Sequence, residues 1–237
     1  YARGHIPGAV YFDIDKICAP DTDLPHMLPD AVMFSSRVRK LGLGDGHRIV
    51  VYDANGIFAA ARVWWMFRAM GVKDVYVLNG TLADWEAVGG ELEDLPPRAI
   101  ERHFTARKRA DLVRDKAQMQ DICTNADTPV LDARAPGRFD GTEPEPREGL
   151  KSGHIPNSIN VPASTLLTPE GAMLPAEKLR LLLGDYLDRP VVTTCGSGVS
   201  AAIISLALAR LGNWDAAVYD GSWCEWAADP NCAIETK

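Results

Sequence analysis

The sequence predicts an α/β fold of two similar domains, each a mainly parallel sheet with helices on both faces. Two observations carry this prediction. Short runs rich in β-branched residues alternate with helical patterns along the chain, which is typical of parallel sheets covered by helices. In addition, four segments of the first half return in the same order in the second half. Ordered matches of this kind indicate that one domain is present twice.

The clearest match is the motif Gly-His-Ile-Pro, which occupies residues 4–7 and returns at 153–156. The other matching pairs are 48–53 with 190–195, 75–80 with 217–221, and Trp85 with Trp226. The repeat predicts a first domain over 1–100 and a second over 110–237. A linker is expected at about 91–109, where Pro96-Pro97 and several charges interrupt the periodicity.

The strands and helices follow from local periodicity. In the first half they are strand 9–12, helix 30–41, strand 48–53, helix 58–70, strand 74–78 and helix 81–87. In the second half they are strands 129–133 and 158–161, helix 176–187, strand 190–194, helix 199–211, strand 216–219 and helix 223–228. The second half has a strand ahead of its Gly-His-Ile-Pro motif, whereas the first has only Tyr1 to Arg3 there. The comparison predicts a further strand within roughly 25–30 residues ahead of Tyr1.

Composition argues against several classes of function. The chain has 237 residues, 46% of them hydrophobic and 24% charged, which suffices for a large buried core. A net charge of −7 without a basic run argues against a nucleic-acid partner, and no apolar stretch is long enough to predict a membrane span. Five cysteines without a CxxC pair favour a reducing compartment. We expect the cytoplasm, with the mitochondrion as the alternative.

A lone cysteine lies where a strand is expected to end. The apolar run Pro190 to Thr194 leads to Cys195, and the glycine-spaced segment Gly196 to Ser200 leads into a helical pattern. The two glycines allow the backbone to curl, so that N–H groups converge on the thiol beside a helix N-terminus. Cysteines in this setting are commonly thiolates and act as nucleophiles. The alternative is burial of Cys195 as a small apolar side chain.

These features resemble the tandem-domain rhodanese superfamily. Within it, the six residues from Cys195 to Ser200 resemble the loop of the 3-mercaptopyruvate sulfurtransferases, and segments 137–147 and 220–223 support the likeness. The resemblance implies that the Cys195 thiolate takes sulfur from 3-mercaptopyruvate, that pyruvate leaves, and that a persulfide remains. A thiol, such as that of thioredoxin, or cyanide would then accept the sulfur. It implies a monomer that needs no cofactor and no metal ion.

The residues after Cys195 bear on the donor. Thiosulfate-using relatives carry cationic residues there, whereas neutral Gly196 and Ser197 favour a mercapto acid. Thiosulfate as the main donor and a non-catalytic binding module remain alternatives. A related phosphatase would need an arginine six residues after the cysteine, where this chain has Ala201.

Further site residues follow from the resemblance. Backbone N–H groups of Gly196, Gly198, Val199 and Ser200 would line the substrate site, and Ser197 would bind the substrate carbonyl or join proton transfer, unless its hydroxyl only stabilises the turn. Arg138 and Arg147 match carboxylate-binding positions, with ion pairing to Glu143, Glu145 or Glu148 as the alternative. Arg134 is expected in a structural ion pair.

The first copy is expected to contribute a proton relay rather than a nucleophile. Asp15 and His26 match positions that form a relay with the loop serine, although a loop histidine is often merely solvated. Asp53 replaces the cysteine, so this half should be non-catalytic. His5 and His154 recur in both copies and are expected to be structural. The cysteines without a comparable setting are Cys18, Cys123, Cys224 and Cys232.

Overall fold

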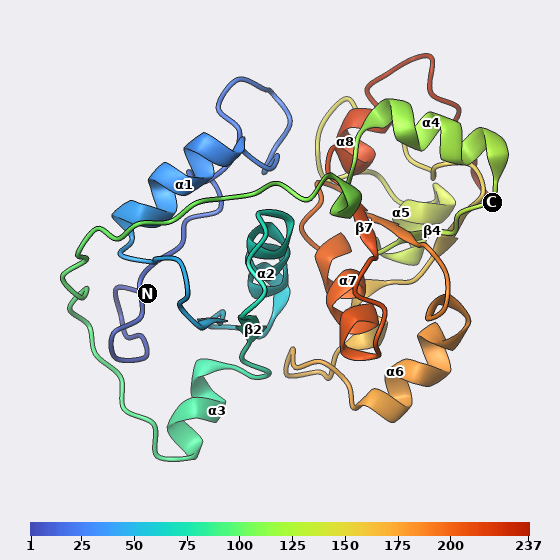
Figure 1. Cartoon of the computed structure of the whole chain (residues 1–237). Coiled ribbons are helices and arrows are strands. Elements are labelled where there is room, and N and C mark those ends of the chain that lie inside the picture. Colours follow the sequence, from blue (N-terminus) through green and yellow to red (C-terminus); the bar gives the residue numbers. More distant parts are fainter.

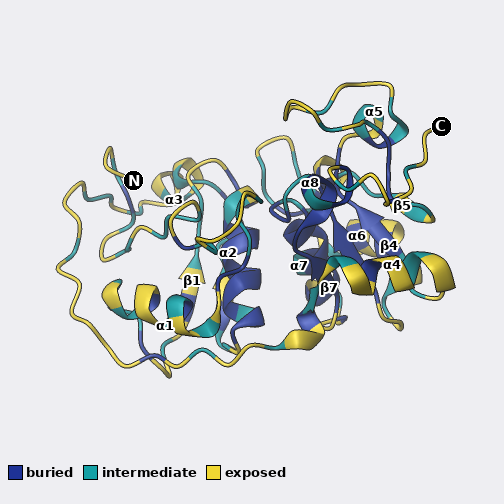
Figure 2. Cartoon of the chain, turned by 90° about the horizontal axis from the view of Figure 1, so that it is seen from above, coloured by how far each residue is buried: buried dark blue, intermediate teal, exposed yellow.

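The two halves of the chain pack against each other through helices α2 (Phe58–Ala69) and α7 (Ala201–Arg210), which lie side by side in the middle of the molecule (Figure 1). The computed structural model describes all residues, Tyr1–Lys237. Both helices are buried along nearly their whole length, whereas the outer helices expose one face (Figure 2). Because both are rich in apolar residues on every face, burial between two layers is the arrangement that their sequences favour.

The second half contains a five-stranded parallel sheet with strand order β3-β7-β6-β4-β5. The strands are β3 (Val113–Arg114), β4 (Val130–Asp132), β5 (Ser158–Asn160), β6 (Val192–Thr194) and β7 (Ala217–Tyr219). The remaining helices of this half are α4 (Lys116–Asn125), α5 (Pro136–Asp140), α6 (Ala176–Leu183) and α8 (Ser222–Trp226). Because β6 and β7 are parallel neighbours, the residues that follow them, Cys195 and Asp220, lie at the same edge of the sheet.

The first half contains a two-stranded parallel sheet flanked by helices. Its elements are α1 (Ala31–Lys40), β1 (Ile49–Val51), α2, β2 (Val75–Val77) and α3 (Leu82–Ala87). The helices begin where side chains satisfy their first N–H groups. Asp30 Oδ1 accepts a hydrogen bond from Met33 N at 2.7 Å, and Thr81 forms a capping box with Asp84.

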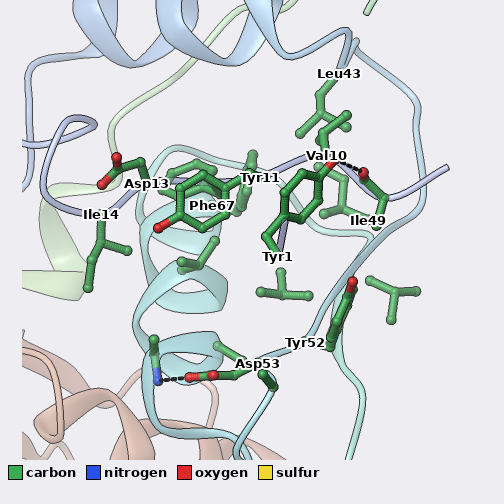
Figure 3. Close-up of a pocket in the computed structure, with 18 of the residues that line it drawn as sticks. Tyr1, Val10, Tyr11, Asp13, Ile14, Leu43, Ile49, Tyr52, Asp53 and Phe67 are labelled. Carbon is green, nitrogen blue, oxygen red and sulfur yellow. Dashed lines mark hydrogen bonds between the residues drawn. The ribbon is translucent and has the colours of Figure 1, made fainter. Parts of the chain in front are cut away.

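The prediction of a strand over 9–12 was wrong, because these residues have no partner strand. In the second half, the matching strand β5 pairs with β4, which lies between β5 and β6. At the corresponding place in the first half, between residues 9–12 and β1, there is a cavity of about 530 Å³ lined by Val10, Tyr11, Ile49 and Phe67 (Figure 3). Segment 9–12 therefore lies beside the sheet without hydrogen-bonding to it.

Sequence reasoning also missed β3, α4 and α5. Strand β3 has two residues and α5 has five, which is too short for a periodic pattern. Helix α4 begins with a capping box between Asp115 and Gln118, a signal that was present in the sequence but was not used. Residues 94–109 form no strand or α-helix and run along the first half, where the Arg107 and Arg109 N–H groups donate to carbonyls of Met70 and Ala69.

The repeat is visible in a clasp that occurs once in each half. His5 forms a bridge with Glu93 and stacks on Tyr1 at 3.8 Å, and His154 forms a bridge with Glu235 and stacks on Phe139 at 3.9 Å. Both histidines are buried. The structural role expected for them is therefore confirmed, since each joins the Gly-His-Ile-Pro motif to the end of its own half.

One hydrophobic cluster of 34 buried residues extends through both halves. Within the first half it includes Phe34, whose ring centroid lies 5.3 Å from Phe67 and 6.0 Å from Phe104. No helix in the structure has both the length and the apolar character that crossing a bilayer requires.

Replacing Phe34 with alanine should lower the free energy of unfolding of the first half by about 3–5 kcal/mol, because a fully buried ring leaves a cavity. Val32→Ala on the same helix is the control, since Val32 is 80% exposed and its loss should change stability by less than about 0.5 kcal/mol. Urea unfolding followed by circular dichroism measures both. Equal effects of the two substitutions would contradict the assigned packing.

Candidate active site

The thiol of Cys195 is buried at the point where β6 turns into the loop that precedes α7. Only 2% of Cys195 is exposed. The N–H groups of Gly196 to Ser200 donate no hydrogen bond within the protein. Gly198 and Val199 are buried and the other three are half-buried. Because buried N–H groups are normally paired, this run of free donors is suited to stabilising an anion.

The carbonyl groups of Cys195, Gly196 and Gly198 are paired, and this orients the N–H groups that follow them. Cys195 O accepts from Trp223 N at 2.9 Å, Gly196 O accepts from Cys224 N at 3.0 Å, and Gly198 O accepts from Arg62 Nη1 at 3.2 Å. A trans peptide places its C=O and N–H on opposite sides. Because each of these carbonyl groups points at its hydrogen-bond donor, the N–H group of the next residue points away from that donor. Gly198 has a φ of +77°, which a residue with a side chain adopts only with strain.

An ion-pair network lies beside the loop. Arg134 is 1% exposed and pairs with Asp132 at 2.6 Å and with Glu145 at 3.0 Å, which confirms the structural ion pair expected for it. Arg138 binds both oxygens of Glu145, at 2.5 and 3.1 Å. Burial opposes the charge of Arg138, but the bond to Glu145 raises its pKa, so that the guanidinium stays positive.

Arg138 reaches the Cys195 loop while it is paired with Glu145. A Cβ atom at Gly196 would lie 3.0 Å from Arg138 Nη2. Arg147, in contrast, is exposed and takes part in none of the ion pairs of this region. Its positive charge acts on both His26 and Cys224. Of the two candidate carboxylate-binding arginines, Arg147 is therefore the one whose charge is uncompensated.

The structure joins two members of the expected relay. His26 Nδ1 lies 3.1 Å from Asp15 Oδ1, which leaves Nε2 of the neutral ring as an acceptor. Burial lowers the pKa of His26, Asp15 partly opposes this, and the charges of Arg62 and Arg147 lower the pKa further. The hydroxyl of Ser197 is half-buried and forms no hydrogen bond to either residue.

Sequence reasoning missed Arg62, the buried arginine of α2 that contacts Gly198, and it used Asp220 only as part of a motif. Arg62 Nη1 lies 2.8 Å from Asp220 Oδ1, and both side chains are almost fully buried. A signal existed, because Arg62 is a charged residue within an otherwise apolar stretch of helix. No group of three or more His, Cys, Asp or Glu side chains is placed to hold a metal ion.

Comparison with known proteins agrees with this geometry. The rhodanese-like domain family matches residues 1–88 and 115–229. The chain is 39% identical to the mitochondrial thiosulfate/3-mercaptopyruvate sulfurtransferase 1 of Arabidopsis thaliana, covering 100% of this chain and 69% of the relative. It is 37% identical to the 3-mercaptopyruvate sulfurtransferase of Escherichia coli K12, covering 99% and 84%. The chain belongs to the rhodanese-like family. The crystal structure of Tum1 from Saccharomyces cerevisiae superposes with a TM-score of 0.88 at 31% identity, covering 99% of this chain and 84% of Tum1.

The first rhodanese-like domain has a carboxylate where the second has a thiol. Asp53 Oδ2 accepts a hydrogen bond from Ala59 N at 3.1 Å, in the first turn of α2 (Figure 3). Asp53 Oδ1 accepts from Asn55 N at 3.4 Å. The Asp53 carboxylate therefore accepts hydrogen bonds from backbone N–H groups of its own domain. All five cysteines are free, and burial raises the pKa of the Cys224 thiol and raises that of Cys123 to about 11.

The titration of His26 tests the arrangement of the first-domain residues. Burial lowers its pKa, so the midpoint should lie below 6.5. Because the unfolded chain then binds a proton more readily, the contribution of His26 to stability is present above that value and is lost as the pH falls. Asp15→Asn should lower the midpoint further, and Arg147→Gln should raise it, since these charges act in opposite directions.

Nuclear magnetic resonance of the histidine ring measures the three midpoints. A higher midpoint in the Asp15→Asn variant would contradict the contact between Asp15 and His26. An unchanged midpoint in Arg147→Gln would place Arg147 away from the ring.

Proposed function

We propose that this protein transfers sulfur from 3-mercaptopyruvate to a thiol or cyanide through a persulfide on Cys195. The single observation that carries the proposal is the buried thiol of Cys195 within a loop whose N–H groups lack partners in the protein. Such a ring of donors stabilises a sulfur anion without a cationic side chain. The sulfurtransferase names of its relatives support the same class of enzyme.

In the first step the Cys195 thiolate attacks the sulfur atom of 3-mercaptopyruvate. An S–S bond forms, the C–S bond breaks, and its electron pair remains on the three-carbon fragment, which leaves as the enolate of pyruvate. In the second step an acceptor thiolate attacks the outer sulfur of the persulfide, and the Cys195 thiolate is restored. The sum moves one sulfur atom, and the enolate takes up one proton.

His26 is suited to move that proton. Its lowered pKa makes the ring neutral at pH 7, so it cannot begin as a stored proton donor. Since Asp15 holds Nδ1, Nε2 is free to accept a proton from the donor thiol or from Ser197. The resulting imidazolium, stabilised by Asp15, can then protonate the enolate. Once substrate is bound, the Ser197 hydroxyl would lie between His26 and the enolate and would pass the proton from one to the other.

The charges around the loop favour a monocarboxylate donor. Arg147 offers an uncompensated guanidinium, and Arg138 lies against Gly196 with much of its charge met by Glu145. A cationic side chain at position 196, as in thiosulfate-using relatives, would enter the space of Arg138. Thiosulfate remains the rival donor, because the name of one relative includes both donors.

We also propose that the acceptor is a small thiol or a protein thiol such as thioredoxin, and that the enzyme works as a monomer in a reducing compartment, the cytoplasm or the mitochondrion. The five free cysteines support that location.

Substitution of Cys195 with serine should abolish transfer from every donor, because no persulfide can form. Intact mass spectrometry of the wild-type protein after 3-mercaptopyruvate treatment should show the gain of one sulfur, and the variant should show none. Cys123→Ala is the matched control and should take up sulfur normally. Retained turnover in Cys195→Ser would contradict the mechanism, and a higher kcat/KM for thiosulfate than for 3-mercaptopyruvate would overturn the choice of donor.

Arg147→Gln should raise the KM for 3-mercaptopyruvate roughly 10- to 100-fold, as expected when a charged hydrogen bond to substrate is lost. The effect on kcat should be small. Arg180→Gln, on the exposed face of α6, makes the same change in net charge and should leave KM unaltered. Equal KM values for both variants in steady-state assays would remove Arg147 from the substrate site.

A further inference from the structure

Arg62 is a charged residue in a place where charge is costly. Its side chain is 0% exposed, and it lies in α2 among residues that are almost all buried and apolar. A buried guanidinium is tolerated only when it is paired and hydrogen-bonded. Its partners therefore indicate what it is used for.

The partners of Arg62 come from three separate segments. Nη1 contacts Asp220 Oδ1 at 2.8 Å and donates to Gly198 O at 3.2 Å. Nη2 donates to the carbonyl of His26. The guanidinium also lies over the ring of Trp65, at 4.4 Å from its centroid. Arg62 thus connects the loop that carries His26 to the loop that follows Cys195.

Asp220 completes the connection. Its second oxygen, Oδ2, accepts a hydrogen bond from Leu28 N at 2.6 Å, two residues beyond His26. A Cβ atom at Gly198 would lie 2.9 Å from Asp220 O and 3.0 Å from Arg62 Nη1. The close approach of these three residues leaves the Gly198 carbonyl little freedom to rotate.

We propose that Arg62, held by Asp220, is a positioning residue that fixes the Cys195 loop and the His26 loop relative to each other. It fixes the peptide between Gly198 and Val199, and thereby the direction of the Val199 N–H, and it holds the backbone of His26. Both effects operate through other residues, since Arg62 is buried away from the substrate. The proposal rests on the proposed persulfide chemistry at Cys195.

The test uses Arg62→Met, which keeps an apolar stem of similar length but no donor. We expect kcat for 3-mercaptopyruvate to fall about 10- to 100-fold, as for a small misplacement of reacting groups. KM should change little, because substrate binding does not involve Arg62. Arg62→Lys should recover part of kcat, since one ammonium group can retain only some of the contacts. Arg68→Met is the control, because Arg68 lies on the same helix but contacts Trp214 instead.

A second readout needs no sulfur donor. The rate of alkylation of Cys195 by iodoacetamide at a fixed pH should fall in Arg62→Met and stay unchanged in Arg68→Met, because misaligned N–H groups stabilise the reacting thiolate less. If the wild-type protein forms no persulfide, the proposed function fails, yet the change in alkylation rate still decides whether Arg62 positions the loop.

Near-ultraviolet circular dichroism shows whether each variant is folded. If Arg62→Met is not folded, Asp220→Asn replaces it, since the amide keeps an acceptor for Leu28 N but removes the charge that holds Arg62. A folded variant of either kind with wild-type kcat and an unchanged alkylation rate would overturn the proposal. A raised KM at constant kcat would overturn it as well.

Discussion

The packing of α2 against α7 is the constraint on which the rest of this structure depends. The two helices come from different domains, and a single hydrophobic cluster extends across them. Separating the domains would expose apolar surface from both, so the interface is held by the same force that holds the core. Because Arg62 lies on one helix and the catalytic loop leads into the other, this packing also sets the distance between the two parts of the site.

In the mechanism proposed above, the two domains divide the chemistry between them. The second supplies the thiol and the N–H groups at the edge of its sheet, where parallel sheets commonly bind ligands. The first supplies His26 and Asp15 from a loop that no strand or helix of its own holds in place. That loop is ordered by Arg62 and Asp220, so its geometry depends on both domains being docked. The sheet of the second domain alone would orient the thiol, but it would not position His26 and Asp15.

Much of this arrangement could be predicted from sequence because it rests on local signals. Most strands and helices beyond the first strand follow from periodicity and capping, and Cys195 is marked by its glycine-spaced loop. Segment 9–12 has the composition of a strand, but pairing depends on a neighbour that composition cannot supply. Arg62 was missed because its partners are far away in sequence. Arg138 was identified as a candidate, but sequence could not decide which of three nearby glutamates would pair with it.

The carboxylate of Asp53 limits how far the two domains could be made alike. Once this side chain accepts the Ala59 N–H, the start of α2 depends on it, and α2 carries both Arg62 and the interface. A cysteine at position 53 would remove that acceptor and would weaken the start of the helix that carries Arg62. A second thiol therefore cannot be introduced at this position by a single substitution without the loss of a backbone hydrogen bond. The difference between the two copies is thus coupled to the stability of α2 and, through α2, to the contact between the domains.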